Sequence, residues 1–540
     1  MKTSFILISI LIIILCLLIK NKKQNKIITF INKYHKILFL IIIIASLFLY
    51  LYKLDIVPIG LNVDEAGAAY DAYSLAHYGV DRFLYKNPVY FINYGSGQNA
   101  LYTYILSILL RFFDYSLFLI RIPAVVFGIL SLIFVYKILK ENKDTSLAII
   151  TIFIMLITPF FIMKSRWALE SYLFLPLLAI SLYYFMRAVN TSKRKYFFFS
   201  GLLFGITLYT YAISYIVIFV FVVINSLYLL LNKKSSISNL ITFGIPLFLL
   251  ALPLIIMLLI NSNIISHEIK TNLFSIPKLI YYRGSELSLK NIKYNLSNNY
   301  LYSVIFIDDY CTWNSISIYG TLYNISILFT ILGFVISLIN VYKSLKRKEY
   351  NLDIPLLIIF LTMLLLSLCI SYVNINKINC LYLPIVYYIG LGIKYVFKKS
   401  DIFGLIILSL YSFYFVNFTK YYFNEYPFYT KDIAHFVSDD FYDALTFAKE
   451  KSESKKIINI DNRNIIQPYI YILLEEKTNP YTFNKYLKMK KDVVLSYKKY
   501  NFVINEIDNK QIYIIKGFLE TNMKVKNFGM FNVYYLDTNI

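Results

Sequence analysis

Charged residues and cysteines are scarce in this sequence of 540 residues. Only 16% of the residues are charged, and the four cysteines are Cys16, Cys311, Cys369 and Cys380. None of them has metal-ligand spacing, which argues against a zinc site and a disulfide framework, although Cys311 and Cys380 could pair. A Gly-rich phosphate loop, a Ser/His/Asp arrangement and repeats of solenoid period are also missing. Their absence argues against a nucleotide-binding enzyme with such a loop, a Ser/His/Asp hydrolase and a solenoid repeat protein.

Apolar residues are abundant and come in uninterrupted runs. They make up 58% of the sequence, and the mean hydropathy is +0.60. No water-soluble core could bury a dozen such segments, so the chain is predicted to be a polytopic, mainly α-helical membrane protein. About twelve spans are predicted, over roughly 4–19, 37–52, 117–137, 146–163, 171–188, 196–212, 213–231, 238–260, 318–342, 354–371, 381–397 and 402–418.

The net charge of +23 would suggest a nucleic-acid partner in a soluble protein, but its distribution argues against one. Lysine and arginine gather in alternate short loops, which is typical of cytoplasmic loops in membrane proteins. The clusters are Lys20-Lys22-Lys23-Lys26-Lys33-Lys36, Lys137-Lys140-Lys143, Lys193-Arg194-Lys195, Lys233-Lys234, Lys343-Lys346-Arg347-Lys348 and Lys398-Lys399. With this orientation, residues 53–116, residues 261–317 and the tail from about 419 all face the outside.

Two apolar runs are open to another interpretation. Ser4 to Ile19 could be a signal peptide, but its charged flank follows it and no small-residue cleavage site does, so it is predicted to be an extra first helix with the N-terminus outside. Ala100 to Phe113 is short and closes with Arg111 and Asp114. It is predicted to be an interfacial helix, because a span there would invert every later loop.

The last part of the chain has a different pattern. Its apolar runs shorten to a few residues, as in 456–460 and 511–515, and a helix-like stretch from Phe441 to Lys449 follows Ser438-Asp439-Asp440. This pattern predicts a small extracytoplasmic α/β or α+β domain. The predicted domains are therefore 1–36 (extra helix and basic cytoplasmic loop), 37–420 (transmembrane catalytic domain with outer loops 53–116 and 261–317) and 421–540 (soluble domain).

Asp64 and Glu65 are adjacent carboxylates just after the apolar run from Ile37 to Tyr52. A general base for chemistry at a membrane surface needs a carboxylate near the lipid interface but outside the hydrocarbon, and this pair is in such a place. The alternative is a solvated pair that caps a helix beginning near Ala66.

Basic residues at the predicted outer boundary could bind an anion there. Arg121 opens the third span, and a guanidinium suits phosphate oxygens, although a helix-end arginine can also snorkel to the headgroups. Lys164 and Arg166 lie in a tight outer turn, where Arg166 could instead pair with Glu170 at i,i+4. Lys377 precedes the eleventh span, and alone it carries little information.

His267 and Glu268 lie in the second large outer loop, with Arg283 further along the chain. One histidine beside one glutamate can bind a metal ion only if the fold adds further ligands. An ordinary loop histidine is the simpler interpretation of His267.

Several strings in the first outer loop and the spans that follow it resemble bacterial glycosyltransferases of the protein O-mannosyltransferase and aminoarabinose transferase type, in the GT-C superfamily. The strings are Asp64-Glu65-Ala66, Tyr70-Asp71-Ala72-Tyr73-Ser74-Leu75, Gly79-Val80-Asp81, Leu101-Tyr102-Thr103-Tyr104, Arg121-Ile122-Pro123-Ala124 with Gly128, and Lys164-Ser165-Arg166. The resemblance covers about 55–190 and fades in later spans. Relatives that modify lipid A often have Glu-Lys-Pro-Pro where this chain has Gly97-Gln98-Asn99-Ala100, and the arginine common before the penultimate span is replaced by the region of Lys377 to Cys380.

The resemblance implies a cell-envelope enzyme of the outer face of the cytoplasmic membrane, which moves a sugar from a polyprenyl-phosphate donor to a hydroxyl of a protein, lipid or glycan. It places the catalytic aspartate at Asp64, with Glu65 as companion acid in an inverting reaction. Arg121 is implied to bind the donor phosphate, with Arg166 and Lys377 as further contacts. A divalent metal ion is a candidate cofactor, with His267 as its weakest-supported ligand.

Two other functions remain open. A transporter or flippase for lipid-linked glycans would need ionisable residues inside its spans, whereas the charges of this chain lie at the span ends. A glycan polymerase or ligase would share the fold without chemistry at Asp64.

Overall fold

The computed structural model describes residues 2–19, 25–297, 300–430, 435–452, 456–504 and 506–536. The chain forms two compact units. Unit 1 comprises Met1–Tyr52, Ala124–Leu252 and Gly284–Tyr421, and unit 2 comprises Lys53–Pro123, Pro253–Arg283 and Tyr422–Ile540. The predicted division into 1–36, 37–420 and 421–540 stays a prediction. Lys20, Lys22 and Lys23 of the first predicted basic cluster lie outside the described residues.

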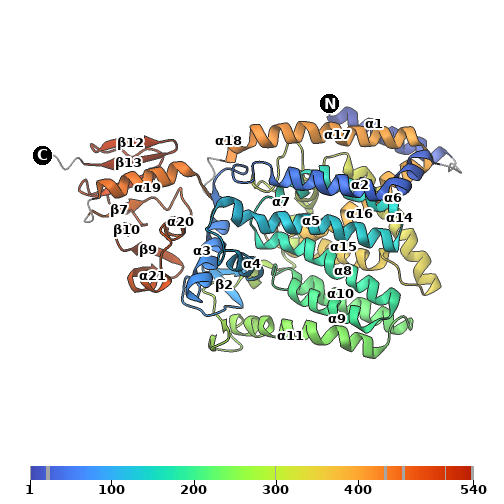
Figure 1. The fold of residues 1–540 in the computed structure, drawn as a ribbon, viewed down its shortest axis with the longest axis horizontal. Coiled ribbons are helices and arrows are strands. Elements are labelled where there is room, and N and C mark those ends of the chain that lie inside the picture. The colour runs from blue at the N-terminus through green and yellow to red at the C-terminus, as the bar shows by residue number, and fades with distance from the viewer. Residues whose placement is uncertain are drawn as a thin grey trace. The chain divides into compact units, whose positions relative to one another are not determined.

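Unit 1 is built from helices (Figure 1). Its main helices are α1 (Lys2–Leu18), α2 (Lys26–Leu51), α5 (Leu117–Asn142), α6 (Thr145–Ile157), α7 (Pro159–Lys164), α8 (Phe174–Thr191), α9 (Arg194–Thr207), α10 (Ser214–Leu231), α11 (Ile237–Asn261), α12 (Asn291–Ser297), α14 (Ser326–Arg347), α15 (Asp353–Cys369), α16 (Tyr382–Lys399) and α17 (Asp401–Asn424). Helices α5, α11 and α17 each continue across the boundary into unit 2. All four cysteines are free thiols.

Among the described residues, eight helices are long and apolar enough to cross a membrane, which makes this a multi-pass membrane protein. They are Lys26–Leu51, Leu117–Asn142, Glu170–Thr191, Ser214–Leu231, Ile237–Asn261, Ser326–Arg347, Asn379–Lys399 and Asp401–Asn424. Three shorter apolar helices, Phe5–Leu18, Thr145–Ile157 and Asp353–Cys369, fall on further predicted spans. The count of about twelve spans and the orientation of the loops stay predictions.

The predicted span over 146–163 is not one continuous helix. Helix α6 ends at Ile157, Thr158 has extended backbone angles, and α7 begins at Pro159. The proline explains the break, because its ring disfavours the helical conformation of the residue before it.

Glycines allow α14 and α16 to pack closely. A Cβ built on Gly333 would lie 1.8 Å from the carbonyl oxygen of Tyr388, and one built on Gly392 would lie 2.4 Å from that of Phe329. Any larger side chain would push the two helices apart. Small residues at a helix contact are the usual device for close packing inside a membrane.

Unit 2 combines short helices with four sheets (Figure 1). Its first part holds β1 (Leu61–Asn62), α3 (Val63–Tyr78), β2 (Tyr90–Asn93), β3 (Ser96–Asn99), α4 (Leu101–Leu109), β4 (Ile269–Lys270) and β5 (Ser275–Ile276). Strands β2 and β3 form a hairpin, and β4 pairs with β5. The nine residues of α4 are too few to cross a bilayer, as predicted for this run.

The C-terminal part of unit 2 is an α/β region, as the sequence predicted. Its elements are α18 (Tyr426–Thr430), β6 (Phe436–Val437), α19 (Asp439–Lys451), β7 (Ile458–Ile460), α20 (Pro468–Glu475), α21 (Pro480–Tyr486), β8 (Leu487–Lys490), β9 (Val493–Tyr497), β10 (Tyr500–Asn501), β11 (Ile512–Lys516), β12 (Lys524–Phe528) and β13 (Phe531–Tyr535). Seven strands form one mixed sheet in the order β12-β13-β11-β7-β10-β9-β8. Strand β6 instead pairs with β1, which joins this region to the start of α3.

Helix α3 begins at Val63 and not near Ala66, because Asn62 caps it. The side chain of Asn62 accepts a hydrogen bond from the backbone N–H of Asp64. The backbone N–H of Asn62 donates to Glu65 Oε2 at 3.1 Å, which completes a capping box. Gly79 ends the helix with a positive φ of 73°. Glu65 therefore takes part in capping the helix, as the alternative interpretation had it, but it is buried and not solvated, and Asn62 supplies the cap itself.

A buried ion pair holds α3 to the loop that follows it. Arg82 Nε donates to both carboxylate oxygens of Asp71, at 2.9 and 3.1 Å, and Nη2 donates to Asp71 Oδ2 at 2.7 Å. Nη2 also donates to the carbonyl oxygen of Gly67 at 2.8 Å. Because Asp71 and Arg82 are almost fully buried, each would leave an uncompensated charge if the other were removed.

We therefore expect Arg82→Met to lower the free energy of unfolding by about 3–5 kcal/mol, as is typical when one partner of a buried ion pair is lost. Thermal unfolding of the detergent-purified chain measures this loss. The double variant Asp71→Leu/Arg82→Met should recover much of it, because no unpaired charge remains. A double variant less stable than Arg82→Met would contradict the explanation.

Candidate functional site

The N-terminus of α3 carries the two predicted catalytic carboxylates. Both Asp64 and Glu65 lie in the first turn of the helix. Unpaired backbone N–H groups and the helix dipole favour negative charge at this position. The two side chains nevertheless have different surroundings, because Glu65 is fully buried whereas Asp64 is partly exposed.

Glu65 forms a buried two-point ion pair with Arg121. Arg121 Nε donates to Glu65 Oε1 and Nη2 donates to Oε2, both at 3.0 Å, and both side chains have no exposed surface. The remaining N–H groups of Arg121 reach the carbonyl oxygens of Leu54, Pro58 and Gly60, at 3.0, 3.0 and 2.8 Å. All five N–H donors are thus committed within unit 2. The roles of Glu65 as companion acid and of Arg121 as phosphate ligand stay predictions.

Asp64 has the environment that a general base requires. The Nδ2 of Asn93, at the end of β2, donates to Asp64 Oδ1 at 3.4 Å. Burial raises the pKa of Asp64 to about 6, with Arg283 and Arg82 lowering it and Glu65 raising it further. A base works best when its pKa lies close to the pH at which it operates. The pKa of Asp64 is raised toward neutral pH, which is the direction that such a role needs.

Arg283 and Arg82 both act on Asp64 through their positive charge, but they differ in exposure. Arg283 is exposed at the start of a short 3-10 helix, whereas Arg82 is buried against Asp71. Sequence reasoning mentioned Arg283 without a role and missed Arg82 and Asn93. The available signals were the charge of Arg82 directly after Gly79-Val80-Asp81, and Gly95 between two short runs, which is consistent with a turn.

Arg166 and Lys377 belong to unit 1, so the structure does not gather all predicted phosphate ligands in one unit. Arg166 is buried, and its Nη1 donates to the carbonyl oxygens of Leu49 and Tyr50, at 2.9 and 2.7 Å. The chain between Arg166 and Glu170 is not α-helical, so the i,i+4 geometry of the alternative interpretation does not apply. Phosphate binding by Arg166 stays a prediction.

Lys164 and Lys377 each have partners within unit 1. Lys164 Nζ is buried and donates to Asn314 Oδ1 at 2.5 Å and to Asn376 Oδ1 at 2.6 Å. Lys377 Nζ donates to Glu286 Oε2 at 2.8 Å and to the carbonyl oxygen of Ser371 at 3.0 Å. Phosphate binding by Lys377 stays a prediction.

His267 is exposed, and its neighbour Glu268 accepts from Tyr85 at 2.6 Å and pairs with Lys270 at 2.7 Å. Across the described ranges, no group of three or more His, Cys, Asp or Glu side chains could hold a metal ion. A divalent metal ion, with His267 as its ligand, stays a prediction.

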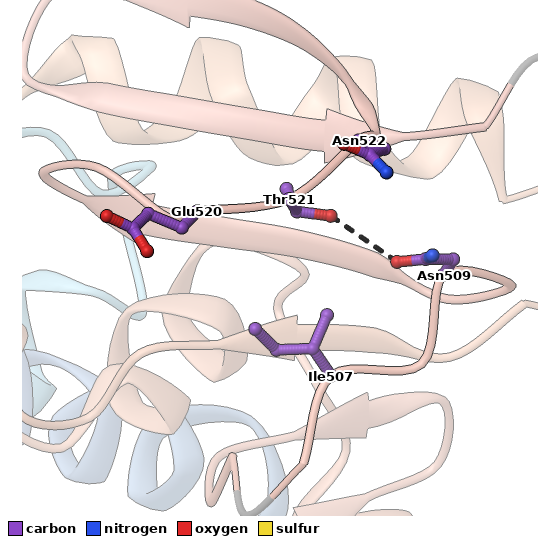
Figure 2. Close-up of a pocket in the computed structure, with 5 residues that line it drawn as sticks. All are labelled: Ile507, Asn509, Glu520, Thr521 and Asn522. Atoms are coloured by element: carbon purple, nitrogen blue, oxygen red, sulfur yellow. Dashed lines mark hydrogen bonds between the residues drawn. The ribbon is translucent and has the colours of Figure 1, made fainter.

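A hollow of about 450 Å³ lies in the C-terminal region of unit 2 (Figure 2). It is lined by Ile507, Asn509, Glu520, Thr521 and Asn522. The only hydrogen bond drawn across it joins Thr521 Oγ1 to Asn509 Oδ1 at 3.3 Å. None of the residues predicted to carry chemistry lines this hollow.

The contrast between the two adjacent carboxylates can be measured. We expect Glu65→Gln to lower the free energy of unfolding by about 3–5 kcal/mol, because it leaves Arg121 buried without a counter-charge. The neighbouring change Asp64→Asn is the matched control. It should change the free energy of unfolding by no more than about 0.5 kcal/mol, because the side chain of Asp64 is partly exposed. Equal shifts in the melting temperatures of the two purified variants would refute the claim that Glu65, and not Asp64, stabilises the fold.

Comparison with solved structures finds partial likenesses. The oligosaccharyltransferase of Archaeoglobus fulgidus tethered with an acceptor peptide is 14% identical, with a TM-score of 0.47, covering 80% of this chain and 62% of that chain. ArnT from Cupriavidus metallidurans bound to undecaprenyl phosphate is 10% identical, with a TM-score of 0.45, covering 66% and 60%. The S. cerevisiae protein O-mannosyltransferase complex bound to the sugar donor is 14% identical, with a TM-score of 0.32, covering 51% and 38%.

These TM-scores are below 0.5, so the likenesses carry no argument about the site, and the chain spans less than two thirds of each of these proteins. None of the curated proteins matches the chain. Residues 99–261, however, match the family model described as dolichyl-phosphate-mannose-protein mannosyltransferase. This match begins at the end of β3 and runs through α11, and it covers less than a third of the chain.

Proposed function

We propose that this chain is a glycosyltransferase that moves one sugar from a polyprenyl-phosphate donor to an acceptor hydroxyl at the outer face of the cytoplasmic membrane. The family match over residues 99–261 supports the class of reaction and the lipid-linked donor. The observation that carries the assignment is Asp64, a partly exposed carboxylate with a pKa near 6 at the start of α3. The basic loops on the opposite ends of the predicted spans support the orientation.

The reaction proposed is a single inverting displacement. Asp64 removes the proton from the acceptor hydroxyl as the acceptor oxygen attacks the anomeric carbon of the sugar. The bond between that carbon and the phosphate oxygen breaks, and the polyprenyl phosphate leaves with the electron pair. The acceptor is a hydroxyl of a protein, a lipid or a cell-surface glycan.

The departing phosphate carries negative charge, so nearby cations would lower the barrier. Arg121, Arg166 and Lys377 are the proposed phosphate contacts. Contact with Arg121 would require it to give up one of its present carbonyl partners. Arg283, which is exposed and acts electrostatically on Asp64, supplies a further cation beside the proposed base.

Sugar transfer by membranes that contain the full chain tests this proposal. Radiolabelled polyprenyl-phosphate mannose, glucose or aminoarabinose serves as donor, and wild-type membranes are expected to transfer at least one of these sugars. Asp64→Asn should reduce the rate by about 100-fold or more, the usual contribution of a general base. Asp55→Asn, which changes an exposed carboxylate of the same loop, is the matched control and should keep the wild-type rate.

Membrane levels of each variant are set equal by quantitative blotting before the rates are compared. If Asp64→Asn transfers the sugar at the wild-type rate, Asp64 is not the base and the proposed mechanism fails.

A further inference from the structure

Tyr94 lies in a strained backbone conformation beside the proposed base. It follows Asn93, and the β2–β3 hairpin turns through Tyr94 and Gly95 because Asn93 pairs with Ser96. Both turn residues have positive φ, 52° and 68°. A two-residue turn of this kind favours Asn-Gly, and a bulky aromatic residue at its first position is disfavoured. Strain of this kind gathers at functional sites.

Gly95 shows that the turn is also confined by its surroundings. A Cβ built on Gly95 would lie 2.5 Å from Cβ of Asp492, in the β8–β9 turn, and 2.9 Å from the ring of Tyr281. The backbone N–H of Tyr281 also donates to the carbonyl oxygen of Gly95 at 2.6 Å. Contacts from two other segments of unit 2 therefore hold the backbone of the turn at Gly95.

The hydroxyl of Tyr94 is buried and has no hydrogen-bond partner within the described part of the chain. A buried tyrosine hydroxyl normally finds one, so this group needs an explanation. Burial and the charge of Asp64 raise the pKa of Tyr94 well above its ordinary value, so the hydroxyl keeps its proton and can donate. Tyr471 and Tyr469 of α20 raise this pKa further, and Arg82 lowers it.

Asn93 places the Tyr94 hydroxyl near the proposed base, Asp64. Its amide donates to Asp64, and Tyr94 is the next residue, so one hairpin end positions both the base and an unused donor. Tyr94 as a residue is partly exposed although its hydroxyl is buried, so a rotation of the side chain is the movement that would bring the hydroxyl to a molecule in front of Asp64.

We propose that the Tyr94 hydroxyl binds the acceptor, by donating a hydrogen bond to an acceptor oxygen next to the hydroxyl that Asp64 deprotonates. The inference rests on the proposed function, because it takes Asp64 as the base. It restricts the acceptor to molecules with a hydrogen-bond-accepting oxygen, such as a carbonyl, ring or phosphate oxygen, close to the reactive hydroxyl. The strained turn is then retained because it holds this donor at the site.

The test uses the full-length chain in source cells that lack the gene, where glycan and lipid profiling identifies the product that wild-type chain restores. Tyr94→Phe removes only the hydroxyl and should lower product formation about tenfold, the usual effect of one hydrogen bond to substrate. Its melting temperature should not fall, because no internal hydrogen bond is lost. Tyr94→Asn should raise the melting temperature, because Asn-Gly suits the turn, and should also lose activity.

Tyr104→Phe is the matched control, since the Tyr104 hydroxyl in α4 donates to the carbonyl oxygen of Pro88 at 2.8 Å. It should lower the melting temperature and keep the activity, the opposite pattern to Tyr94→Phe. If Tyr94→Phe forms product at the wild-type rate, the inference is wrong. If Tyr94→Phe is fully active but Asp64→Asn is inactive, only this inference fails and the proposed function stands. If Asp64→Asn is itself active, the proposed function is refuted.

Discussion

The ion pair between Glu65 and Arg121 is the contact on which the candidate site depends. It joins the first turn of α3 to the start of α5, and the same guanidinium ties down three carbonyl oxygens of the preceding loop. Neither side chain is exposed, so the pair can be broken only at the cost of a buried charge. With Glu65 committed in this way, the adjacent Asp64 is left partly exposed and available for chemistry. Two neighbouring carboxylates thus have separate tasks, one structural and one proposed to be chemical.

Local features of the sequence predicted much of the fold. Long apolar runs marked the helices of unit 1, because a helix that faces lipid needs about twenty apolar residues. Short runs at 456–460 and 511–515 marked strands β7 and β11, and the Ser438-Asp439-Asp440 string marked the start of α19. The break between α6 and α7 also has a local cause in the sequence, because Pro159 disfavours the helical conformation of Thr158.

The convergence of distant segments could not be predicted from the sequence. Arg283 and Asn93 reach Asp64 from positions that are far away along the chain, and hydrophobic periodicity carries no information about such contacts. The same holds for the bond from Arg82 to Asp71, since a charge in an outer loop is usually solvated. The position of Arg121 in the sequence predicts a functional role, but the pairing of all its N–H donors with internal partners is visible only in three dimensions. The roles of the site residues stay predictions, while the structure shows that Glu65 pairs with Arg121 and that Asp64 is partly exposed.

The central claim is that Asp64 reacts as an ionised carboxylate whose pKa is raised by burial and lowered by the charge of Arg283. The most direct test is the pH dependence of single-turnover sugar transfer, with whichever polyprenyl-phosphate sugar the wild-type chain accepts. The rate should fall as the pH decreases through about 6, because protonation removes the base. Arg283→Met removes a charge that lowers this pKa, so the fall should move up by about one pH unit. A rate that is constant between about pH 5 and 8, or a fall that Arg283→Met does not move, would contradict the account.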